Sequence, residues 1–205
     1  MSYLLRHPGE VAFYTMQHVM LVGVALIIAL GIALPLGILA ARNKRIATPL
    51  LGFLGALYTI PSLAVLALLV HYVGLGFWTA IVMLAMYAQY ILVRNIATGL
   101  REVPTAQRDA ALGIGMTAAQ RLWRVEFPQA VPVMLGGVRI AIVALIAIAT
   151  LASYVNAGGL GVLIFDGLQR DYIEKTVAGS TPAVLLAIVA DLLFRALEKR
   201  TSAGR

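Results

Sequence analysis

Five apolar runs separated by polar intervals dominate the chain. A transmembrane helix needs about 20 mainly apolar residues, and roughly 17 to 25 are tolerated, so each run is long enough to cross a bilayer. Only helices and closed barrels satisfy their own backbone polar groups inside lipid. The pattern therefore predicts an all-α integral membrane protein with about five transmembrane helices. The expected spans are residues 19–41, 50–72, 77–93, 131–154 and 176–194.

Composition supports a membrane protein and removes several other classes. Hydrophobic residues make up 61% of the 205 residues and charged residues only 12%, and the mean hydropathy is +0.91. A soluble domain of this size has too small an interior for so much apolar surface. Because the sequence contains no cysteine, disulfides, thiol chemistry and thiolate metal sites are excluded.

The basic residues are distributed unequally between the two sides of the predicted spans. Of the 16 Lys and Arg residues, 12 follow the first, third or fifth span, three fall on the opposite side, and Arg139 lies within a span. Because Lys and Arg are enriched in cytoplasmic loops, we expect the N-terminus outside and the C-terminus in the cytoplasm. The net charge of +7 then reflects topology, and no nucleic-acid partner is expected.

These assignments divide the chain into three parts. We expect residues 1–14 to form an extracytoplasmic, interfacial segment, residues 15–194 the transmembrane domain, and residues 195–205 a cytoplasmic tail. The mixed apolar and polar character of residues 1–18 favours a position at the membrane surface over a span. Residues 160–169, in the longer outer loop, are expected to form a short surface helix.

The longest polar interval, residues 102–132, is called the polar loop below. Its glycines and capping residues predict two short helices. Glycines end the first helix, and a capping box begins the second. A capped pair of helices between two spans favours presentation to a partner. An ordinary solvated connection is an equal alternative on pattern alone. The marker residues are Pro104, Thr105 (expected N-cap), Gly113 and Gly115 for the first helix, and Thr117, Gln120 and Pro128 (expected end) for the second.

The polar loop resembles the cytoplasmic EAA loop of importer permeases of the ATP-binding cassette (ABC) class. That pattern reads Glu-Ala-Ala, three residues, Gly, nine residues, Ile, any residue, Leu-Pro. The chain keeps this spacing from Asp109 to Pro128, with Asp, Val and Phe replacing Glu, Ile and Leu. The resemblance implies a coupling helix, between the third and fourth spans, that docks on a separate ATPase. The implied coupling residues are Arg108, Asp109, Ala110, Ala111, Gly115, Phe127 and Pro128.

Resemblance to this type I permease family implies an assembly. Two permease subunits, identical or paralogous, form one pathway in the lipid bilayer of the bacterial inner membrane. Two cytoplasmic ATPase subunits bind ATP and Mg²⁺, and an extracytoplasmic binding protein delivers the substrate. The chain contains no Gly-Lys-Ser/Thr phosphate loop of its own. We therefore expect no cofactor in this chain and no enzyme activity without the partner subunit.

Within the family, the chain most resembles the osmoprotectant branch. The resemblance rests on residues 59–64, 148–152, 157–161 and 164–165. It implies substrates such as glycine betaine, choline or carnitine. An importer for another small solute, such as an amino acid, remains an alternative. An ion-coupled carrier is a weaker one, because such carriers use ionisable groups near the midplane, and a scaffold without transport activity is a third.

Two groups of residues are candidates for the pathway or its gate. Pro35 and Pro61 interrupt the first two spans, and a proline removes a backbone donor and bends a helix. Ordinary helix packing is the alternative explanation for these positions. The candidates are Tyr58, Thr59, Pro61 and Ser62 at the second bend, and Tyr154 and Asn156 at the outer end of the fourth span.

Two charges lie inside predicted spans. Arg139 and Asp191 are close to the cytoplasmic ends, within reach of water for a long side chain. Asp191 precedes Arg195 by four residues, which is a pairing distance on a helix. These features favour anchoring or local pairing over a proton or ion site. His18 is likewise expected to be a polar anchor at the membrane edge.

Overall fold

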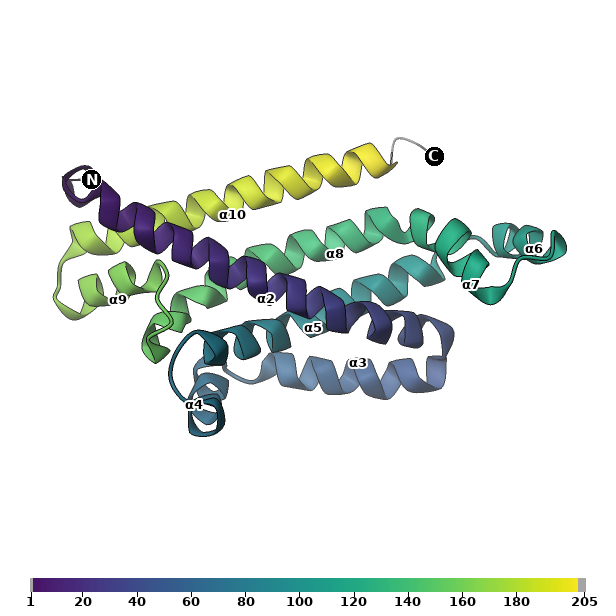
Figure 1. Ribbon diagram of the computed structural model, residues 1–205, viewed down its shortest axis with the longest axis horizontal. Coiled ribbons are helices and arrows are strands. Elements are labelled where there is room, and N and C mark those ends of the chain that lie inside the picture. Colours follow the sequence, from purple (N-terminus) through teal and green to yellow (C-terminus); the bar gives the residue numbers. More distant parts are fainter. Residues whose placement is uncertain (1, 203–205) are drawn as a thin grey trace.

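The computed structural model describes residues 2–202 and confirms an all-α protein (Figure 1). Every element is helical in this part of the chain. The elements are α1 (Ser2–Arg6), α2 (Pro8–Arg42), α3 (Lys44–Thr59), α4 (Ser62–Val73), α5 (Phe77–Arg101), α6 (Thr105–Gly113), α7 (Ala118–Arg121), the π-helical η1 (Leu122–Glu126), α8 (Phe127–Ile148), the 3₁₀-helical η2 (Ala149–Val155), α9 (Gly161–Gln169) and α10 (Ile173–Ser202).

Four helical segments within residues 2–202 are long and apolar enough to cross a membrane. They are Pro8–Arg42, Phe77–Arg101, Ala118–Val155 and Ile173–Thr201. A fifth crossing is possible where α3 and α4 act together, although this pair is bent by 96°. The prediction of about five transmembrane helices is confirmed in number.

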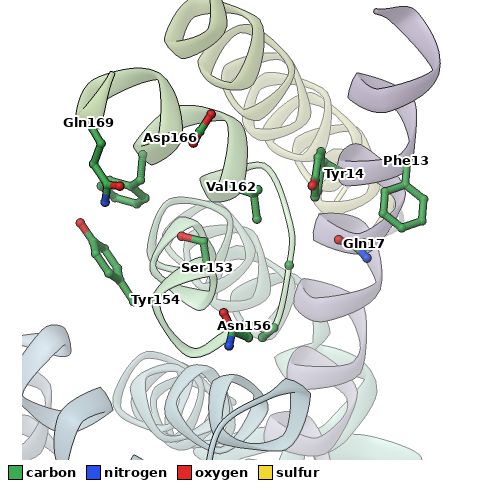
Figure 2. Close-up of a pocket in the computed structure, with 12 residues that line it drawn as sticks. Phe13, Tyr14, Gln17, Ser153, Tyr154, Asn156, Val162, Asp166 and Gln169 are labelled. Atoms are coloured by element: carbon green, nitrogen blue, oxygen red, sulfur yellow. The ribbon is translucent and has the colours of Figure 1, made fainter. Parts of the chain in front are cut away.

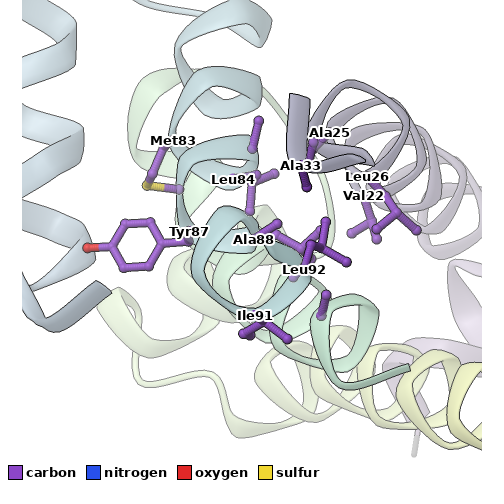
Figure 3. Close-up of a cluster of buried hydrophobic side chains, with 14 of the residues drawn as sticks. Val22, Ala25, Leu26, Ala33, Met83, Leu84, Tyr87, Ala88, Ile91 and Leu92 are labelled. Carbon is purple, nitrogen blue, oxygen red and sulfur yellow. The ribbon is translucent and has the colours of Figure 1, made fainter. Parts of the chain in front are cut away.

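Helix α5 is the centre of the bundle. Inside its most apolar stretch, 67% of the residues are buried, compared with 17 to 33% in the other three long spans. Its buried side chains, among them Leu84, Ala88 and Leu92, pack against Val22 and Leu26 of α2 (Figure 3). Helices α2, α3, α4 and α8 all contact α5. The other three long spans are less buried than α5, and they keep an apolar side directed outward, toward the lipid.

The second predicted span is a broken helix. Pro61 lacks an N–H group and disfavours helical geometry in the residue before it, and Ile60 is extended, with φ −66° and ψ 133°. The chain therefore leaves α3 at Thr59 and starts α4 at Ser62. The hydroxyl of Tyr87 donates a hydrogen bond to the Ile60 carbonyl. Helix α2, in contrast, continues through Pro35.

Two predicted boundaries differ from the structure. Helix α2 already begins at Pro8, where proline is compatible with a first helical turn, so the first span includes much of the segment expected at the membrane surface. The interfacial position of residues 1–14 stays a prediction. Helix α5 extends eight residues past Val93, to Arg101. Apolar residues up to Leu100 remain buried against neighbouring helices there. This packing keeps the helix continuous past Val93, although Arg94 and Arg101 are basic.

His18 holds α2 to the far end of the fourth span. It is completely buried, its Nε2 lies 3.0 Å from the Ile146 carbonyl oxygen, and the Leu160 N–H donates to its Nδ1 at 3.3 Å. Accepting at Nδ1 leaves the proton on Nε2, which donates to Ile146. The expected anchor at the membrane edge is therefore wrong. His18 is a fully bonded core residue that joins three segments.

Arg139 and Asp191 form an ion pair between α8 and α10. Arg139 Nη1 lies 3.5 Å from Asp191 Oδ1, and Arg139 Nε lies 3.5 Å from Glu198 Oε2. The predicted partner of Asp191, Arg195, follows it on the same helix and is not the partner that the structure gives. The expectation of a pairing role is confirmed, and the partner comes from the facing helix.

Close packing in the bundle predicts a stability difference between two glycines of α2. A Cβ atom at Gly37 would lie 2.5 Å from Ile96 Cγ2 and 2.6 Å from Ile96 Cβ, whereas one at Gly31 would meet nothing within 4 Å. Overpacking of this kind costs about 1 to 3 kcal/mol. We expect Gly37→Ala to lower the melting temperature of the purified protein in detergent. Gly31→Ala is the matched control and should melt at or above the wild-type temperature, since alanine favours helix. Equal melting of both variants would contradict this packing.

Candidate functional site

The polar loop folds as two helices that project from one end of the bundle (Figure 1). Helix α6 ends at Gly113, and Gly115 follows with φ +80°, as predicted for a glycine-terminated helix. The capping box is confirmed, because Thr117 and Gln120 each accept a hydrogen bond from the other's backbone N–H. Two details were wrong: Pro104 is the N-cap of α6, without a side-chain bond, and Thr105 is already helical.

Pro128 does not end the second helix. It lies in the first turn of α8, where the fixed φ of proline is compatible with helical geometry. Between α7 and α8 the backbone winds as the π-helix η1, and Glu126 and Phe127 both keep right-handed helical angles. The loop is therefore continuous with the fourth span through helical backbone. A displacement of α7 acts directly on α8, with no flexible connection between them.

A buried carboxylate lies where the loop meets the membrane helices. The side chain of Glu126 is only 4% exposed, and it forms ion pairs with three arginines from three segments. Arg42, at the end of α2, lies 3.0 Å away, Arg121 of α7 lies 3.1 Å away, and Arg108 of α6 lies 3.8 Å away. We call these four residues the Glu126 cluster. Since both loop helices and α2 contact one carboxylate, they are held together electrostatically.

The predicted coupling residues separate into two groups. Arg108 and Ala111 face inward: Arg108 also donates to the Leu100 carbonyl, and Ala111 is 4% exposed. Asp109 and Ala110, in contrast, are exposed, as is Gly115. Phe127 is half-buried, with its ring centroid 5.1 Å from that of Trp123, and Pro128 is exposed. One side of the motif thus attaches the loop to the bundle, and the other is accessible.

Sequence reasoning missed several residues of this site. Leu112, Ile114 and Trp123 are 54%, 75% and 52% exposed, and such apolar groups at a projecting loop mark a contact surface. Glu126 was treated only as a variable position of the motif. The signal that identifies it is a lone carboxylate between the apolar residues Val125 and Phe127, since a buried charge needs partners.

The first group of gate candidates lies at the break between α3 and α4. Tyr58 packs against Tyr87 and Tyr90, with ring centroids 6.0 and 5.7 Å away. The Thr59 hydroxyl donates to the Ala56 carbonyl at 2.7 Å. Pro61 is exposed and Ser62 begins α4. These residues therefore lie where α3 ends and α4 begins.

The second group, Tyr154 and Asn156, lines a pocket at the opposite end of the bundle from α6 (Figures 1 and 2). The pocket has a volume of about 440 Å³ and lies between α2, the end of η2 and α9. We call it the α9 pocket. Asn156 ends η2 in the left-handed conformation, at φ 57°, which asparagine tolerates better than most residues. None of Tyr58, Thr59, Pro61 and Ser62 is among the residues that line this pocket.

The pocket wall is fixed by hydrogen bonds to α2. The Gly159 N–H donates to Gln17 Oε1 at 3.1 Å, next to the bond from Leu160 to His18. Gly158 and Gly159 have φ values of 82° and 83°, which side chains rarely adopt. This backbone lies so close to α2 that a Cβ at Gly158 would lie 2.2 Å from Gln17 Oε1.

Comparison with known proteins identifies the family. Residues 33–203 match the family described as "Binding-protein-dependent transport system inner membrane component". The chain belongs to this family. It is therefore a multi-pass membrane subunit of a transport system that depends on a binding protein, and the predicted permease class is confirmed.

Curated relatives and solved structures agree with this permease assignment. The chain is 40% identical to the osmoprotectant import permease protein OsmW of Salmonella typhimurium over 96% of this chain and 94% of the relative. It is 37% identical to the choline transport system permease protein OpuBB of Bacillus subtilis over 99% and 94%. A chain of the inward-facing MetNI methionine ABC transporter has the same fold, with a TM-score of 0.83 and 21% identity over 96% and 98%.

The Glu126 cluster of this permease predicts a local stability effect. Replacing Glu126 by Gln keeps the shape but removes the charge that three guanidinium groups share. Because those arginines are partly exposed, we expect a loss of about 1 to 3 kcal/mol. Hydrogen exchange of the backbone amides in residues 105–126 should accelerate, while α5 keeps its protection.

The matched control for this variant is Glu102→Gln, which removes an exposed carboxylate at the start of the same loop. It should leave exchange in residues 105–126 unchanged. If Glu126→Gln and Glu102→Gln behave alike, the Glu126 cluster does not hold the loop to α2.

Proposed function

We propose that this chain is the permease subunit of an ATP-driven importer for osmoprotectants such as glycine betaine, choline or carnitine. Two observations support the substrate class. Relatives named for osmoprotectant, choline and carnitine transport are 35 to 40% identical over at least 91% of the chain. The solved structures with this fold that are named for amino acid or methionine transport are 18 to 24% identical.

In this proposal, the polar loop binds a separate ATPase subunit in the cytoplasm, with the N-terminus outside. The observation that carries it is the division of the motif into an attached and an accessible side. Leu112, Ile114 and Trp123 offer the exposed apolar contacts expected of an interface, and Asp109 adds an exposed charge at its rim. The distribution of basic residues supports the same orientation.

Force then passes from the ATPase to the membrane helices through bonded contacts. The partner binds ATP and Mg²⁺ and moves the loop. The loop acts on α8 through continuous helical backbone and on α2 through Arg42 and Glu126. A second permease subunit, identical or paralogous, completes the pathway, and the binding protein delivers the solute at the α9 end. The movement of the loop and the attached helices is then a rigid-body shift between two states of the permease. Differential binding of the ATPase to these two states biases the shift.

The coupling role is tested in proteoliposomes that contain the whole system, namely permease, ATPase and binding protein. Asp109→Lys reverses an exposed charge, and Gly115→Trp forces a bulky residue into φ +80°. We expect each variant to insert normally but to lower ATP-driven choline uptake at least tenfold, about 1.4 kcal/mol in coupling free energy.

The matched control is Glu102→Lys, the same charge change at an exposed carboxylate that lies before α6 and outside the coupling motif. It should transport at the wild-type rate. Normal uptake by both loop variants would remove the coupling assignment. Uptake of an amino acid, with no uptake of quaternary amines, would reassign the substrate while leaving the coupling intact.

A further inference from the structure

The α9 pocket has walls suited to a small organic cation. Aromatic side chains come from three elements: Tyr14 from α2, Tyr154 from η2 and Phe165 from α9. The rings of Tyr154 and Phe165 lie side by side, with centroids 4.6 Å apart. Figure 2 shows Tyr154 and Tyr14 on opposite sides of the hollow, with Ser153 and Val162 between them. Tyr154 is 50% exposed, so its ring remains accessible.

The only charged side chain among the twelve described residues that line the pocket is a carboxylate, Asp166. Lys175 Nζ and Arg170 Nε each lie 2.7 Å from it, on different oxygens. Hydrogen bonds, first from Lys175 and then from Arg170, hold the pKa of Asp166 below its usual value. The carboxylate is therefore ionised at neutral pH. Glu10 approaches Lys175 at 4.0 Å, so the surrounding charges balance and do not repel a cation.

A trimethylammonium group needs this kind of surrounding. It carries a positive charge but no N–H, so hydrogen-bond acceptors cannot bind it in the ordinary way. The negative faces of aromatic rings attract it instead. A pocket of about 440 Å³ holds a solute of choline size together with some water.

We propose that the α9 pocket is an entry site on the permease that binds the trimethylammonium group of the solute against Tyr154 and Phe165, near Asp166. This inference rests on the proposed substrate class. It adds a binding step on this chain, which is separate from binding by the delivering protein and precedes passage through the bundle.

The test uses the full-length permease in lipid nanodiscs without the binding protein, so that any bound solute is bound by this chain. Titration calorimetry compares choline with 3,3-dimethyl-1-butanol, a neutral molecule of the same shape in which carbon replaces the quaternary nitrogen. An aromatic cation site binds choline and rejects the neutral analogue, whereas a merely apolar hollow binds both alike. Glycine betaine, which has the same trimethylammonium group, is expected to bind as well.

Substitutions then locate the site. Tyr154→Ala and Phe165→Ala should each weaken choline binding about 3- to 30-fold, the range expected for one aromatic contact with a cation. Tyr154→Phe keeps the ring and should retain binding. Tyr72→Ala is the matched control, because Tyr72 is 82% exposed on α4 and lies outside the pocket, and it should bind choline as the wild type does.

Several outcomes would overturn the proposal. They are equal binding of choline and its neutral analogue, unchanged binding in Tyr154→Ala and Phe165→Ala, or an absence of choline binding by the wild-type chain. These failures differ from failure of the proposed function. A permease that transports choline with its partners but does not bind it in this pocket refutes the entry site alone, whereas an assembly that does not transport quaternary amines refutes the substrate class.

Discussion

Backbone polar groups inside a membrane must be bonded within the protein, and this constraint determines where the chain can leave helical geometry. A carbonyl or N–H without a partner costs several kcal/mol in hydrocarbon. Two interruptions of the bundle are bonded by side chains from neighbouring helices. Tyr87 bonds the Ile60 carbonyl at the break between α3 and α4, and His18 bonds both Ile146 and Leu160 where η2 turns back toward α9. These two irregular segments are therefore positioned by residues on neighbouring helices.

The same reasoning applies to charge at the loop end. An isolated carboxylate as buried as Glu126 would be strongly unfavourable, and three arginines compensate for its burial. The consequence is mechanical as well as electrostatic. Arg42 belongs to the first span and Arg108 to the first loop helix, so neither moves without changing its distance to the shared carboxylate. An importer that is driven from its loop needs such an attachment, because a loosely connected helix would move without displacing the spans.

Local rules predicted the elements whose causes are local. The capping box at Thr117, the glycine end of α6 and the break at Pro61 all follow from residues within one or two turns of each other. Local rules failed where a distant segment decides the outcome. Asp191 has a suitable partner four residues later, yet it pairs with Arg139 because α8 faces α10. His18 resembles a surface residue in sequence and becomes a core residue only after η2 and α9 fold over it.

In the candidate site too, some features follow from nearby residues and others depend on distant segments. The motif spacing located the loop and its accessible residues, but it gave Glu126 no role, because three arginines far apart in the sequence supply that role. Pro128 was misassigned for a related reason. Proline ends one helix and begins another equally well, and only the packing of η1 onto α8 distinguishes the two. The sequence singled out two residues of the α9 pocket, Tyr154 and Asn156, as gate candidates. The other walls of the pocket, from α2 and α9, depend on how the termini of these helices meet.

Helix α8 connects the polar loop with the α9 pocket, and both of its ends depart from regular α-helical winding. It starts at Phe127, directly after the π-helical turn that carries Glu126, and it ends in the 3₁₀ turns that carry Tyr154. Its 22 residues span about 33 Å, roughly the hydrocarbon thickness of a bilayer. Continuous helical backbone, from Ala118 to Val155, therefore connects the loop with the wall of the α9 pocket.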